Sequence, residues 1–158
     1  MTEQRTESHI YTILAAGALA TLAFESYGQA ISPLLGFSRL APVPLATQTI
    51  QVLTGFRAPE WAYLLHVVTG LLFYPLGWYL IARPIQRRIM PALPWLVTSV
   101  VYGVVLWIFA LYIMAHLVAG NPPFLGFTGI TWVALTGHVI FAIIAAWIME
   151  ARGAIFGQ

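Results

Sequence analysis

Two histidines within long apolar segments are the side chains whose setting most suggests chemistry. His66 lies between Ala62 and Gly70, each four residues away, and His138 has an alanine four residues to either side. On a helix, small residues at this spacing leave a notch on the face that carries the histidine. Haem b requires two imidazoles from facing helices, with room beside them for a flat macrocycle. His66 and His138 are therefore candidate cofactor-binding residues.

A second chemistry adds one carboxylate and one more histidine. Glu25, His66, His116 and His138 form a nitrogen and oxygen ligand set that suits zinc, copper or iron. The same groups suit a path for protons or ions. None of the three chemistries has a diagnostic motif here. A purely structural role also stays open, because small residues at four-residue spacing are how transmembrane helices pack.

Several enzyme classes lack their usual residues. The chain has no cysteine, which excludes a thiolate nucleophile, a disulfide, an iron–sulfur cluster and covalent c-type haem. All acidic residues are glutamates, and no Ser-His-Asp arrangement, HExxH motif or phosphate-binding loop is present. We predict no catalytic residues, and the interpretation leans away from an enzyme.

Composition places the chain in a membrane. Of its 158 residues, 60% are hydrophobic and 8% are charged, whereas about a quarter of the residues in soluble domains are charged. The net charge of +2 comes from scattered arginines and gives no reason to expect nucleic acid as a partner. The expected partner common to all interpretations is the lipid bilayer.

Four apolar runs predict an all-α fold, a four-helix transmembrane bundle forming one domain over residues 1–158. The predicted spans are about 10–31, 61–82, 93–118 and 131–149. Runs of this length cross a hydrocarbon core of about 30 Å at about 1.5 Å per residue. Between the first two spans, the segment of about 44–56 starts at Pro44 and has Gly55 near its end. It predicts a short interfacial helix in the first outer loop, with a re-entrant or partner-contacting segment as the alternative.

The arginines predict the orientation. With four spans, both termini and the 83–94 loop share one side. That side has five arginines, whereas the other has only Arg39 and Arg57. The positive-inside rule therefore places both termini in the cytoplasm. Glu25, His66 and His138 then lie roughly 9–13 Å below the outer surface, and His116 lies near that surface.

The second half of the chain resembles a group of small bacterial inner-membrane proteins with a domain of unknown function. The resemblance covers roughly residues 60–150 and rests on short motifs: Tyr102-Gly103 early in a span, His116 at its end, a proline-bearing loop, and Gly137-His138 in the next span. It implies a four-span bundle in the bacterial inner membrane and draws attention to His116 and His138. It implies no activity and does not explain the 32–60 connection.

Two classes of function follow. The first is a non-enzymatic membrane protein that acts as an accessory subunit of a larger membrane complex, because the soluble portion is short and the proline-rich outer loop suits a protein partner. The alternative is a protein that binds haem b or a transition metal for electron transfer, or that transports protons or ions, through Glu25, His66, His116 and His138.

Overall fold

The computed structural model describes residues 2–152, with side chains from His9 onward. Every regular element in this part of the chain is a helix, so the predicted all-α class is confirmed. Four helices are long and apolar enough to cross a membrane: His9–Leu34, Pro59–Ile89, Trp95–Val118 and Gly129–Ala151. The side chains of Glu3, Arg5 and Glu7 in the polar segment before the first apolar run lie outside the described part.

Three of these long helices change register along their length. The first consists of α1 (Thr2–Ser26), η1 (Tyr27–Ile31) and α2 (Ser32–Leu34). The second consists of α4 (Pro59–Val68), η2 (Thr69–Phe73), α5 (Tyr74–Gly77), η3 (Trp78–Ala82) and α6 (Arg83–Ile89). The third joins α7 (Trp95–Ile108) to η4 (Phe109–Val118), and α8 (Gly129–Ala151) is a single α-helix. The segments η1 to η4 are π-helical.

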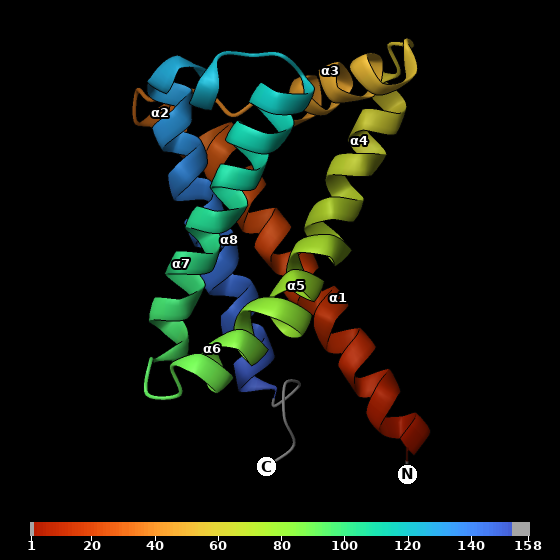
Figure 1. The fold of residues 1–158 in the computed structure, drawn as a ribbon, viewed down its shortest axis with the longest axis vertical. Helices are drawn as coiled ribbons and strands as arrows, with labels where there is room; N and C mark the ends of the chain where they lie inside the picture. Colours follow the sequence, from red (N-terminus) through yellow and green to blue (C-terminus); the bar gives the residue numbers. More distant parts are fainter. Residues whose placement is uncertain (1, 153–158) are drawn as a thin grey trace.

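Prolines account for three of the four π-helical segments. Pro33, Pro75 and Pro84 each lie two residues beyond the end of such a segment. Proline has no N–H and its ring collides with the carbonyl four residues earlier, so the preceding turn widens. Figure 1 shows the result in the second long helix, which bends at α5 so that α6 turns toward the lower end of α7.

Small residues bring the helices close together in the core. Ala16 and Ala20 on α1 and Ala146 on α8 are fully buried, and α8 packs against both α1 and α7. A Cβ atom at Gly103 of α7 would lie only 2.7 Å from the Cα atom of Val139 on α8. Close backbone contact of this kind is the usual packing mode of helices in membranes.

One helix stands apart from this core at one end. Figure 1 shows α4 diverging from the third long helix, with α3 (Pro42–Thr54) lying across the gap at that end of the molecule. Packing contacts of α4 are mainly with α3, while η2 packs against α1. The predicted 44–56 segment thus lies largely within α3, which begins two residues earlier and is ended by Gly55 in the left-handed region, with φ of 77°.

The opposite end of the molecule is held by an ion pair. Arg83 at the start of α6 is only 8% exposed and donates two hydrogen bonds to Glu150 of α8, at 2.7 and 2.6 Å. Gln86 also accepts a hydrogen bond from this guanidinium. Figure 1 places the first turns of α1, the last turns of α8 and α6 at this end, opposite α3.

Candidate functional site

A cavity of about 720 Å³ lies where α4 diverges from η4. Its walls come from α1, α4 with η2, α7 with η4, and α8, and α3 covers one end. Most of the lining is apolar. A large apolar cavity with a few polar groups directed into it is the usual form of a small-molecule site.

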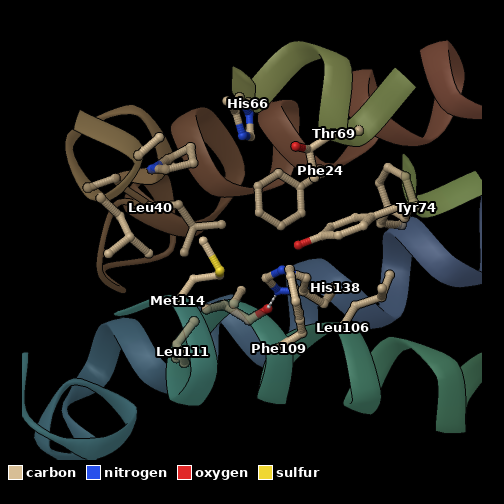
Figure 2. A pocket seen from close by; sticks show the side chains of 18 of the residues that line it. Phe24, Leu40, His66, Thr69, Tyr74, Leu106, Phe109, Leu111, Met114 and His138 are labelled. Carbon is tan, nitrogen blue, oxygen red and sulfur yellow. Dashed lines mark hydrogen bonds between the residues drawn. The ribbon is translucent and has the colours of Figure 1, made fainter. Parts of the chain in front are cut away.

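The two ends of the cavity differ in character. Figure 2 shows the rings of Phe24, Tyr74, Phe109 and His138 gathered at one end, and Leu40, Leu111 and Met114 at the other. The aromatic rings are in mutual contact: the centroids of Tyr74 and Phe109 are 6.5 Å apart, and those of Tyr74 and His138 are 6.2 Å apart. The cavity therefore offers flat, polarisable walls at one end and flexible aliphatic walls at the other.

His138 is the polar group at the aromatic end, and it is only 6% exposed. Its Nδ1 atom lies 2.7 Å from the backbone carbonyl oxygen of Ala134, one turn earlier on α8. A carbonyl only accepts, so Nδ1 carries a proton and donates it there. In the neutral ring Nε2 is then an acceptor. No hydrogen bond joins Nε2 to any described residue.

Three hydroxyl groups that line the cavity, those of Thr21, Thr69 and Tyr74, form no hydrogen bond with a described residue. Figure 2 shows the Tyr74 hydroxyl directed into the same space as His138. Tyr74 is held in place through its backbone, because the Tyr102 hydroxyl donates to its carbonyl oxygen at 2.6 Å. The π-helical turn η2, widened by Pro75, carries Thr69 and ends beside Tyr74.

Glu25 and His66 form a pair at the wall of the cavity. Oε1 of Glu25 lies 2.5 Å from Nε2 of His66, and the side chains are 34% and 18% exposed. His66 lines the cavity whereas Glu25 does not, so the carboxylate approaches the ring from outside the cavity. Of the four predicted site residues, the structure brings these two into direct contact.

The other predicted juxtapositions are not formed. His66 and His138 face the same cavity, but Figure 2 shows the Phe24 ring between them, with centroids 6.3 Å and 5.2 Å from the two imidazoles. His116 does not line the cavity, because its Nδ1 donates to the carbonyl oxygen of Asn121 at 2.7 Å where the chain turns after η4. Within residues 2–152, no three His, Cys, Asp or Glu side chains are placed to hold a metal ion together.

A polar contact closes one side of the cavity under α3. The Asn121 side-chain amide donates to Oε1 of Gln48 at 3.0 Å, and both residues line the cavity. This hydrogen bond joins α3 to the chain after η4. On the other side of the cavity, α3 packs against α4. The helix α3 therefore spans the cavity from one wall to the other.

Tyr74 and Thr69 lie in the predicted span 61–82, and neither is among the predicted site residues. Tyr74 directly precedes a proline in mid-helix. A proline there predicts a local change of helix register, and such changes often occur at functional sites. That signal singles out the neighbourhood of Tyr74, but not the direction of its hydroxyl.

Comparison of the chain with protein-family models, with curated proteins and with solved structures finds no match. The resemblance to small bacterial inner-membrane proteins therefore stays a prediction.

Proposed function

We propose that this protein is a four-span integral membrane protein that binds an apolar small molecule in the cavity between α4 and η4. The observation that carries the proposal is the cavity itself: about 720 Å³, mostly apolar, with the Nε2 atom of His138 and the hydroxyl of Tyr74 left without partners among the described residues. Both atoms are accessible from the cavity, so a bound molecule can reach them. A ligand with polar atoms at the aromatic end of the cavity would form hydrogen bonds with both groups.

The proposed membrane placement rests on the helices and on the arginines. The end that carries α6 and the last turns of α8 holds Arg83, Arg87, Arg88 and Arg152, whereas Arg39 and Arg57 flank α3. By the positive-inside rule we place the α6 end, and with it both termini, in the cytoplasm. The helix α3 then lies at the outer surface. The bacterial inner membrane, which the resemblance implies, stays a prediction.

In this placement the ligand enters from the lipid. The second long helix is the least buried, with 17% of its most apolar stretch inside the protein against 56% for α8. Since α4 packs on α3 and little on η4, we propose the space between α4 and η4 as the route of entry. An apolar molecule dissolved in the membrane reaches the cavity there without passing through water.

The cavity supports this function better than haem or metal binding. Nε2 of His66 is already engaged by Glu25, and the Phe24 ring occupies the space between the two candidate axial ligands. A haem b at this position would have to break the Glu25–His66 pair and displace Phe24. Proton or ion movement through the Glu25–His66 pair stays an alternative for which the cavity offers no continuous polar lining.

Binding of a fluorescent apolar probe tests the proposal. We expect 1-aminoanthracene to bind the purified protein in lipid nanodiscs saturably, with enhanced fluorescence. Ala110 lines the cavity, so Ala110→Phe should remove this signal by filling the space. The matched control is Ala18→Phe, because Ala18 lies exposed on α1 outside the cavity. Absence of saturable binding, or wild-type binding by a folded Ala110→Phe variant, would show the proposal to be wrong.

A second proposal, that the protein is an accessory subunit of a membrane complex, is favoured by a specific surface. Exposed apolar residues lie close in sequence here: Val52 and Leu53 in the last turn of α3, Phe56 just after it, and Trp61 at the start of α4. Photo-crosslinking from positions in 33–59 in intact membranes should capture one neighbouring protein. The proposal fails if nothing is captured and the protein extracted in mild detergent migrates alone.

A further inference from the structure

We propose that the ligand is an uncharged aromatic alcohol, of the phenol or hydroquinone type, that carries an apolar tail and donates its hydroxyl hydrogen to Nε2 of His138. This inference rests on the proposed function and names the chemical class of its ligand. Three independent features of the cavity carry it: its lack of charge, the direction of its hydrogen bonds, and the different character of its two ends.

The charge of the lining excludes an ionic ligand. No arginine, glutamate or other permanently charged side chain lines the cavity, and the one histidine near a carboxylate, His66, is already paired with Glu25. A phosphate, carboxylate or ammonium group would be buried there without a counter-charge, at a large cost in free energy. Lipid headgroups and fatty acid anions are therefore poor occupants.

The direction of the hydrogen bonds selects a hydroxyl. Because Nδ1 of His138 donates to the Ala134 carbonyl, the neutral ring presents an acceptor to the cavity through Nε2. A ligand must supply a hydrogen-bond donor to Nε2, and a ketone, an ester or an ether has none. The Tyr74 hydroxyl has no partner among the described residues and can donate to the oxygen of the same group. One hydroxyl group on the ligand can thus donate to His138 and accept from Tyr74.

The shape of the cavity places a ring and a tail. The group that donates to His138 must lie among Phe24, Tyr74 and Phe109, where ring faces and edges offer favourable stacking to another ring. Beyond this end, Leu40, Leu111 and Met114 provide an aliphatic wall for a flexible chain. The cavity of about 720 Å³ is within the usual range for a ligand of this size.

Matched probes test the inference. 4-Dodecylphenol and 4-dodecylanisole share ring and chain, but the anisole lacks the donor, and 4-dodecylbenzenesulfonate adds a charge. Each competes with 1-aminoanthracene on the nanodisc-embedded protein. We expect the phenol to bind about 5-fold more tightly than the anisole, the factor that one net hydrogen bond of about 1 kcal/mol supplies. The sulfonate should compete least.

Variants test whether the preference for the phenol over the anisole depends on His138. His138→Phe should bind phenol and anisole equally, and His116→Phe, a histidine outside the cavity, should keep the wild-type preference. If His138→Phe does not fold, His138→Leu provides the second test, since it also removes the Nε2 acceptor and should bind phenol and anisole equally. Equal binding of phenol and anisole by wild type, tightest binding of the sulfonate, or an unchanged preference in His138→Phe would overturn the inference. If the wild-type protein does not bind 1-aminoanthracene at all, the proposed function is wrong.

Discussion

The carboxylate of Glu25 on α1 lies 2.5 Å from the imidazole of His66 on α4, although 41 positions separate them in the chain. The pair joins α4 to the core close to the level at which this helix diverges from η4. It is therefore placed to hold one wall of the cavity in position.

A double-mutant cycle on this pair measures its contribution. We expect Glu25→Gln and His66→Leu each to lower the free energy of unfolding, and the double variant to lose less than the sum. The coupling should be on the order of 1 kcal/mol, as for polar pairs between helices in membranes. Reversible denaturation in mixed micelles provides the values. Strictly additive losses would show that the two side chains are not coupled.

The ion pair at the opposite end should matter more, because Arg83 is nearly fully buried. Glu150→Gln leaves that guanidinium without its carboxylate and should lower the free energy of unfolding by about 3 kcal/mol. Arg88, five residues further along on α6, is exposed, so Arg88→Gln should change stability by less than about 0.5 kcal/mol. Similar melting temperatures for the two variants would contradict the importance of this contact.

The crossing of α1 with η2 depends on a glycine. A Cβ atom at Gly17 would collide with the backbone carbonyl of Leu71, the residue four positions before Pro75. We expect Gly17→Ala to force the two helices apart and to cost about 1–3 kcal/mol of stability. Ala18→Val adds more volume at the adjacent exposed position and should be tolerated. Thermal unfolding followed by circular dichroism compares the variants, and equal stability would argue against close backbone contact here.

The proposed orientation is open to a direct labelling test, because the chain has no native cysteine. Gln51 on α3 and Ala92 in the turn between α6 and α7 are both exposed and lie at opposite ends of the molecule. A membrane-impermeant maleimide added to intact cells should label Gln51→Cys, and should label Ala92→Cys only after the membrane is opened. The reverse pattern would invert the topology, and labelling of both in intact cells would contradict a spanning bundle.

Much of the fold was predictable because its signals are local. Long apolar runs and the near absence of charge predict the four long helices, and the Pro44 and Gly55 region predicts most of α3. The candidate residues were partly predictable for the same reason: a histidine in an apolar run is conspicuous whatever its neighbours are. That Glu25 pairs with His66, and not with His116 or His138, was not predictable from the sequence.

What the sequence by itself determined is therefore the all-helical class, the apolar character of the long helices, and the presence of Glu25, His66 and His138 within them. Only the tertiary structure decided which groups meet. It paired His66 with Glu25, placed Phe24 between the two imidazoles, turned His116 toward Asn121, and directed Tyr74 into the cavity. The physical reason is that hydropathy acts along a single helix, whereas a cavity forms where two helices distant in sequence do not pack against each other.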